Sequence, residues 1–333
     1  MSIDTRAPGV VSADVDVQDW LAFRARREAD LARPHDWLSV VGFVWLGDEP
    51  AAVPGVPGSW WVADGEAHVA ARTADGLRLL GSSDAASGAA DAASLGRATG
   101  VLDGEASVAV GEAGAVPFAA FRSGAGDAAD DAASADDDET EVRVEVLRRG
   151  GYYALRLRDP QAPARTSFDG VPTWDYDPAW RLTARLEPYA APRSVVVGAA
   201  APGLTQRANA VGEVVLERDG EEVRLVATGS PSSWSVAFTD ATSGVTSSAW
   251  RAVAVLGDPA DGDGEVDLNR TVNFPYAFSD FGTCPRPIEG NALPWAVEAG
   301  ERSPSGRTGV PPTEGGPTAL PGPQLLGGAV QDG

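Results

Sequence analysis

The chain has 333 residues, of which 43% are hydrophobic, so it is long enough to form one large domain or two smaller ones. It carries 48 acidic residues against 26 basic ones, for a formal net charge of −22, and every basic residue is an arginine. Nucleic acid binding requires a positively charged surface that attracts the phosphate backbone. The charge of this chain therefore argues against a nucleic acid partner.

A chain that lacks lysine and is rich in Ala, Gly and Asp resembles the proteins of haloarchaea. In salty cytoplasm the self-repulsion of such a chain is screened, because the Debye length is about 3 Å at 1 M ionic strength. We therefore expect an acidic, halophilic and cytoplasmic protein. The alternative is an acidic surface that meets a basic partner, but the acidic residues are spread along the chain.

Cysteine and histidine are scarce. A single cysteine, Cys284, excludes an internal disulfide and a cysteine-cluster metal site, and His35 and His68 are the only histidines. We therefore expect no metal and no cofactor. The N-terminus has no signal-peptide pattern and no apolar run approaches the length of a membrane span, so no membrane partner is expected either.

The first element along the chain is a predicted helix. Residues 1–14 are expected to form a disordered leader, and the helix to run from Asp14 or Asp16 to Arg33, where Pro34 ends it. Its apolar side carries Val17, Trp20, Leu21 and Leu31. The next segment, HDWLSVVGFVWLGDEP, is too apolar for one exposed face and too short to cross a bilayer, so it is expected in the core.

Short β-type runs separated by turn signals follow. The predicted hairpin turns are Asp64-Gly65, Gly150-Gly151, Asp219-Gly220 and Ser243-Gly244. Strands at such spacing, with almost no helix after residue 50, predict a mainly β protein: an antiparallel β sandwich or barrel with an N-terminal helix.

Two segments are expected to lie outside that core. Residues 123–139 combine an acidic run with no large apolar side chain, so a disordered insertion is predicted. Residues 303–333 are rich in Gly and Pro, which predicts a disordered tail. The remainder, residues 15–302, is expected to be a single β-rich domain.

Residues 267–302, which we call the closing segment, are the most informative stretch. They are crowded with polar groups, and their prolines prevent a long helix or a regular strand. Binding and catalytic groups concentrate on loops that a rigid scaffold holds, so a site is expected here.

Several blocks of the chain carry a family resemblance. HDWLSVVGFVWLGD, FTDATSGVTSSAWRAVAVL, DLNRTVNFPYAF and TCPRPIEGNALPWAVEAGER resemble successive blocks of the domain of unknown function 1684 family, over residues from about 20 to 302. Two positions depart from the family pattern: Leu268 stands where an aromatic residue is expected, and Tyr276 about where a first cysteine often lies. A paired-thiol role is thus impossible here. The resemblance implies a shared architecture and no activity.

Two arginines are candidate ligand groups. Arg158 closes a predicted strand and can offer its guanidinium to an anionic ligand, or pair with a carboxylate such as Asp159. Arg251 lies in an otherwise apolar strand, so its guanidinium needs a buried partner. The available carboxylates are Asp240, Asp267, Glu298 and Glu301. If one edge stays open, Arg251 becomes an anion hook instead.

The closing segment supplies further candidates. Cys284 is expected to be a packed thiol, since it would be reactive only beside a base or positive field such as His35 or Arg286. Asn269, Asn273 and Asn291 either bond the backbone of turns or line a polar pocket. A calcium loop starting at Asp261 fails, because the positions that need glycine and glutamate hold valines.

Two main functions remain open at this stage. The first is a binding or structural domain for a small polar or anionic ligand; the candidate residues are Arg158, Arg251, Asn269, Asn273, Cys284, Asn291, Glu298 and Glu301. The alternative is a hydrolase in which Glu298 or Glu301 acts as general base and Arg251 stabilises an anion. A domain that docks another protein is a third alternative. Catalytic residues and oligomeric state are not predicted.

Overall fold

The computed structural model describes residues 10–81, 100–122 and 140–304, and the side chains of the first helix from residue 16 onward. The predicted insertion at 123–139 lies outside the described residues, as do most of the predicted tail and the first nine residues of the predicted leader.

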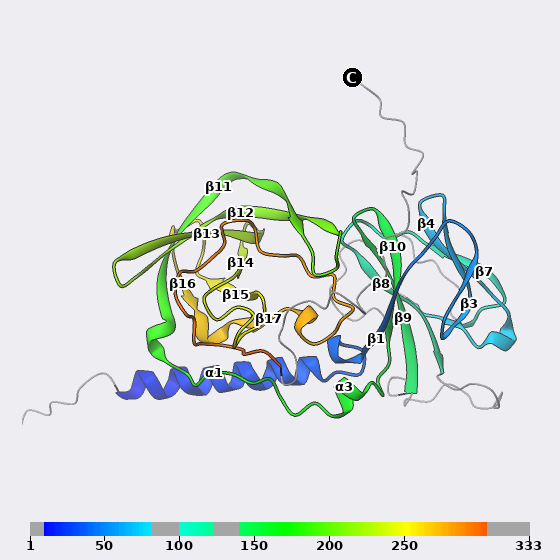
Figure 1. The fold of residues 1–333 in the computed structure, drawn as a ribbon, viewed down its shortest axis with the longest axis horizontal. Helices are drawn as coiled ribbons and strands as arrows, with labels where there is room; N and C mark the ends of the chain where they lie inside the picture. Colours follow the sequence, from blue (N-terminus) through cyan, green and yellow to red (C-terminus); the bar gives the residue numbers. More distant parts are fainter. Residues whose placement is uncertain (1–9, 82–99, 123–139, 305–333) are drawn as a thin grey trace, which may run out of the picture.

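The N-terminal half is built from two antiparallel sheets (Figure 1). The six-stranded sheet has the order β1-β10-β9-β8-β5-β6 and the four-stranded sheet the order β2-β3-β4-β7. Their strands are β1 (Val40–Trp45), β2 (Ala51–Val53), β3 (Val56–Ala63), β4 (Glu66–Ala71), β5 (Arg78–Leu79), β6 (Gly100–Val101), β7 (Gly104–Val108), β8 (Ala115–Arg122), β9 (Glu141–Arg149) and β10 (Tyr152–Arg158).

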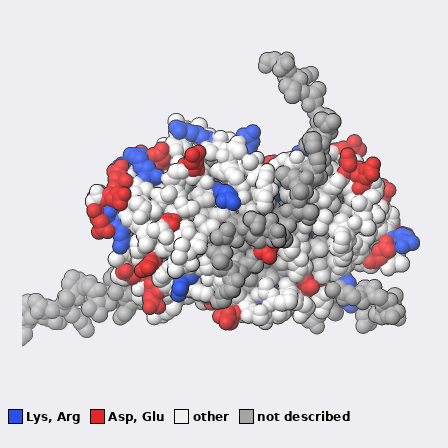
Figure 2. Space-filling model, in the orientation of Figure 1, with Lys and Arg blue, Asp and Glu red and all other residues white. Residues whose placement is uncertain are grey.

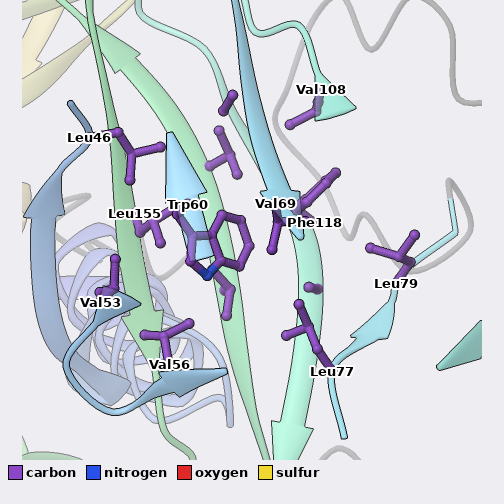
Figure 3. Close-up of a cluster of buried hydrophobic side chains, with 14 of the residues drawn as sticks. Leu46, Val53, Val56, Trp60, Val69, Leu77, Leu79, Val108, Phe118 and Leu155 are labelled. Carbon is purple, nitrogen blue, oxygen red and sulfur yellow. The ribbon is translucent and has the colours of Figure 1, made fainter. Parts of the chain in front are cut away.

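One hydrophobic core joins these two sheets. Trp60 and Val69 from the four-stranded sheet meet Phe118 and Leu155 from the six-stranded sheet, and all four are buried (Figure 3). The Trp60 and Phe118 rings lie edge to face with their centroids 5.9 Å apart. Buried positions alternate along the second half of β3, as expected for a strand with one face in a core, whereas Tyr153, Ala154, Leu155, Arg156 and Leu157 of β10 are all buried, so both faces of β10 are covered.

The C-terminal half consists of seven further strands. They are β11 (Arg181–Gly198), β12 (Thr205–Arg218), β13 (Glu221–Ser230), β14 (Ser233–Phe238), β15 (Arg251–Leu256), β16 (Asp263–Asp267) and β17 (Val272–Asn273). Because β15 pairs with β14 as well as with β16 and β17, the antiparallel pairings run in a ring from β11 through β12, β13, β14, β15 and β16 back to β11. A second core, with Val214, Trp234 and Phe238, lies against this ring.

The long helix α1 (Val10–Leu31) runs beneath the C-terminal half (Figure 1). It begins earlier than Asp14 because the residues after Pro8 and Gly9 contain no helix breaker, and it ends just before Arg33. Trp20 donates its indole N–H to Asn269 O at 3.0 Å, and Leu31 is buried. The short helices are α3 (Pro163–Thr166), η1 (Trp37–Ser39), η2 (Thr73–Asp75), η4 (Pro178–Trp180), η5 (Leu268–Arg270) and η6 (Pro275–Ala277).

The predicted fold class is confirmed: the protein is mainly β and antiparallel, with one long N-terminal helix. The predicted hairpin turns at Asp64-Gly65, Gly150-Gly151 and Asp219-Gly220 are found, whereas β14 and β15 pair but are joined by the longer loop 239–250, in which Ser243-Gly244 lies. Asp64 and Asp219 adopt positive φ angles of 52° and 54°, and each is followed by a glycine with positive φ, as tight hairpin turns require. In the part of the chain that the structure describes, no helix combines the length and the apolar character needed to cross a membrane.

Gly212 tests the packing of the ring. A Cβ at this position on β12 would lie 2.2 Å from Trp234 Cη2 and 2.7 Å from Glu187 O. We expect Gly212→Ala to lower the free energy of unfolding in urea by about 3 kcal/mol, because neither the buried indole nor the backbone can move aside cheaply. Gly111→Ala is the matched control, since an added Cβ there meets nothing within 4 Å. Equal stability of the two variants would contradict this packing.

Candidate functional site

The closing segment folds back across the C-terminal half, as expected. Isolated bridges pair Pro285 with Ala199, Ala292 with Thr239 and Glu301 with Thr173. Its apolar side chains Leu293, Val297 and Ala299 belong to the same core as β14 and β15. The segment is therefore an integral part of the structure although most of it is irregular.

Arg251 holds the end of this segment. Its side chain is fully buried, and Nη2 lies 2.9 Å from Asp240 Oδ2, so the predicted buried ion pair is confirmed with Asp240 as the carboxylate. The guanidinium also donates to three main-chain oxygens: Val297 O, Ala299 O and Glu301 O, at 3.0, 2.7 and 3.0 Å. Only Nε lacks a partner in the described part of the chain. Arg251 therefore has a structural role: it holds the main chain at the end of the closing segment in place.

The two candidate general bases lie in different environments. Glu298 is exposed, whereas Glu301 is buried. Glu301 Oε1 accepts from Arg27 Nε at 3.1 Å and Oε2 accepts from the Asn273 N–H at 2.6 Å. Both carboxylate oxygens thus tie the closing segment together and to α1, which is a poor arrangement for activating a water.

The three candidate asparagines bond main-chain groups. Asn269 accepts from the Asp177 N–H at 3.0 Å and donates to Asp177 O at 2.9 Å. Asn273 donates to Arg302 O at 2.8 Å. Asn291 accepts from the Val226 N–H at 2.8 Å and donates to Val226 O and Ala237 O, both at 2.9 Å. All three are buried, so their side chains replace the ladder bonds that an irregular segment lacks.

Arg158 lies on β10 of the N-terminal half. It shares Glu145 with Arg156, at 3.2 and 2.9 Å respectively, and both guanidinium groups lie over the Trp37 ring. Sequence reasoning missed Arg156, although it follows the same alternation as Arg158. Burial lowers the pKa of Arg156 to about 10, with Glu145 opposing that shift. Neither arginine joins Arg251 in a common cluster.

Cys284 is buried, as expected. Burial raises the pKa of its thiol to about 11, and the nearby Arg156 and Arg149 only partly offset this. At neutral pH the thiolate that a nucleophile needs is therefore suppressed.

Two adjacent hollows lie under residues 285–292. The larger, of about 300 Å³, is lined by Thr239, Ala249, Trp250, Arg286, Pro287, Ile288, Glu289, Gly290, Asn291 and Ala292. The smaller, of about 110 Å³, is lined by Ala208, Thr228, Ser235, Ala237, Phe274, Pro285, Arg286, Ile288 and Asn291. Arg286, Ile288 and Asn291 line both. Of the predicted site residues only Asn291 is among them.

Arg286 is the polar side chain that stands out at these hollows. Its Nε donates to Ala199 O at 3.1 Å and its guanidinium carbon lies 5.1 Å from the Trp250 ring centroid. The residue is exposed, and no hydrogen bond or ion pair engages its two Nη atoms within the described residues. Trp250 is itself held by Tyr276, whose ring stacks on it with centroids 3.9 Å apart. The sequence did not indicate that Arg286 is a candidate ligand group. It stands between two prolines in a loop, and its neighbours Ala199 and Trp250 are distant along the chain.

The described residues contain no group of three or more His, Cys, Asp or Glu side chains able to hold a metal ion.

On the face shown in Figure 2, acidic side chains gather toward the two ends, and much of the visible area between them is uncharged.

A pair of glutamate variants separates a structural role from a catalytic one. Glu301→Gln is expected to lower the free energy of unfolding by about 3 kcal/mol, because it leaves Arg27 and Arg24 facing a neutral amide inside the protein. Glu298→Gln should change it by less than about 0.5 kcal/mol, since this side chain is exposed. Urea unfolding measures both, and equal values would refute the assigned role of Glu301.

The thiol gives a prediction of reactivity and of pH dependence. At pH 8 Cys284 should react with a disulfide reagent only after guanidinium chloride has unfolded the protein, because burial raises the pKa of the thiol to about 11. Since this pKa is raised on folding, the thiol's contribution to stability is complete below about pH 8.5 and declines as the pH rises toward 11. Fast reaction of the native protein, with Cys284→Ala as the blank, would contradict this.

Comparison with known proteins gives a family and a structural relative, without an activity. A family model described as "Protein of unknown function (DUF1684)" matches residues 166–302. The chain is also similar to a solved structure, the solution NMR structure of the uncharacterized protein from gene locus rrnAC0354 of Haloarcula marismortui. The two are 31% identical, the match covers 42% of this chain and 79% of that chain, and the TM-score is 0.35. No curated protein matches the chain.

Proposed function

This chain belongs to the DUF1684 family of proteins of unknown function, and we propose that it is a binding domain for a small anionic molecule held at Arg286. One observation carries the proposal: an arginine with two unengaged Nη atoms lies at the edge of two hollows, over a tryptophan face. Of the other candidates in the closing segment, Asn269, Asn273, Asn291 and Glu301 already have partners inside the protein, and Glu298 is an exposed carboxylate that would repel an anion.

The chemistry of Arg286 suits an anion. A guanidinium presents its donors in a planar fork that matches a carboxylate or a phosphate. Here Nε is fixed by Ala199 O, and Gly198 leaves room for the side chain, since a Cβ there would lie 3.3 Å from Arg286 Cδ. A side chain fixed in this way loses less conformational entropy when it binds, which favours affinity.

The position of Glu289 decides where the anion would lie. Glu289 is the one carboxylate among the residues that line the two hollows, and it lines the larger hollow only. Like charges repel, so the anion is expected at the Arg286 edge that faces the smaller hollow.

A third hollow, of about 480 Å³ on the N-terminal half, is less suitable. Its lining includes Asp75, Asp103 and Glu105, and its arginine, Arg72, pairs with Asp75 at 3.5 Å. The excess of carboxylates disfavours an anion there, and one of them, Asp75, lies beside the Arg72 guanidinium.

The hydrolase alternative finds no support in this geometry. Glu301 is engaged by Arg27 and Asn273, Glu298 is exposed, and Arg251 is enclosed by main-chain oxygens. The proposal is therefore limited to binding.

The test uses acetate and inorganic phosphate as probes at constant ionic strength. We expect at least one of them to raise the unfolding midpoint of the wild-type protein, because ligand bound to the native state stabilises it by about 2.7 kcal/mol at 100 times Kd. Arg286→Gln should lose this response. The matched control is Arg193→Gln, which removes another exposed arginine lying over an aromatic ring, that of Tyr189, away from both hollows. No response in the wild type, or equal responses in both variants, would refute the proposal.

A further inference from the structure

We propose that the ligand is a short-chain aliphatic carboxylate, whose carboxylate binds Arg286 and whose hydrocarbon chain fills the smaller hollow. This inference rests on the proposed binding function and adds the class of ligand. The observation behind it is the lining of the smaller hollow. The polar side-chain atoms of this lining either contact other protein groups or belong to Arg286.

The smaller hollow is apolar in character. Five of its lining residues are Ala208, Ala237, Phe274, Pro285 and Ile288. They come from β12, β14 and the closing segment, so its wall is assembled from three separate parts of the chain.

The remaining lining residues offer few free hydrogen bonds. Asn291 uses its amide oxygen and both amide hydrogens on Val226 and Ala237. The hydroxyls of Thr228 and Ser235 each contact the other residue's main-chain oxygen across β13 and β14, at 3.5 Å. A sugar or another polyol placed here would leave its own polar groups without partners, whereas a hydrocarbon would not.

Arg286 supplies the anchor for the charged end. It lines the smaller hollow, and its Nη atoms are unengaged in the described structure. A carboxylate can accept two hydrogen bonds from the guanidinium while the chain attached to it enters the hollow. Inorganic phosphate can use the same donors but has nothing to fill the apolar space.

The size of the hollow limits the chain. A volume of about 110 Å³ is roughly four times the 30 Å³ that a water molecule occupies in the liquid. A tail of about four carbon atoms therefore fits, and we expect pentanoate or hexanoate to bind more tightly than acetate or octanoate.

The experiment is titration calorimetry of the full chain with acetate, butanoate, pentanoate, hexanoate, octanoate and phosphate. In the wild type the affinity should rise about fourfold for each added methylene, as expected for burial of a CH₂ group, and stop rising once the hollow is full. Ala237→Leu, and independently Ala208→Leu, should abolish this gain with chain length, because a larger side chain then occupies the hollow. The control is Ala254→Leu, an exposed alanine on β15 outside both hollows, which should retain the gain.

The outcomes separate the two proposals. If wild-type protein binds acetate, phosphate and hexanoate equally, or if both leucine variants retain the dependence on chain length, the inference about the ligand is wrong and anion binding at Arg286 stands. If none of the probes binds the wild type, or if binding survives in Arg286→Gln, the proposed function itself fails.

Discussion

The closing segment depends on the buried ion pair between Arg251 and Asp240. An irregular segment that packs on a core carries main-chain oxygens without strand partners, and each unsatisfied group would destabilise the fold. The Arg251 guanidinium donates hydrogen bonds to three such oxygens, Val297 O, Ala299 O and Glu301 O, and Asp240 balances its charge. Since both partners are fully buried, losing either would leave an uncompensated charge in the core.

This constraint also positions the hollows. With its C-terminal end fixed by Arg251 and its middle by Asn291, the closing segment must pass over the ends of β12 and β14. Arg286 is carried on that passage and emerges beside Trp250. The structural arginine and the proposed binding arginine thus differ in their partners and not in residue type: both Nη groups of Arg251 are engaged within the protein, whereas no described partner engages the Nη atoms of Arg286.

The features that the sequence could predict are those with local causes. A turn such as Asp219-Gly220 needs only positive φ at two neighbouring residues, so it predicts a hairpin wherever it lies between alternating strands. The closing segment could be singled out for the same reason, because its prolines exclude regular structure. The partner of Arg251 could be narrowed to four carboxylates, but choosing Asp240 needed the pairing of β14 with β15.

The roles of individual side chains could not be read in this way. Asn291 bonds Val226 and Ala237, which lie 65 and 54 residues away along the chain, so nothing near it in sequence shows whether its amide faces the backbone or a cavity.

The net charge of −22 bears on the proposed role of Arg286. Long-range repulsion opposes any anion, but it is screened beyond about 8 Å at physiological ionic strength, whereas a guanidinium contact beside an apolar hollow acts within hydrogen-bond distance. In the proposed site, recognition of an anion would therefore have to be local, and the apolar wall next to Arg286 would supply an attraction that the net charge cannot.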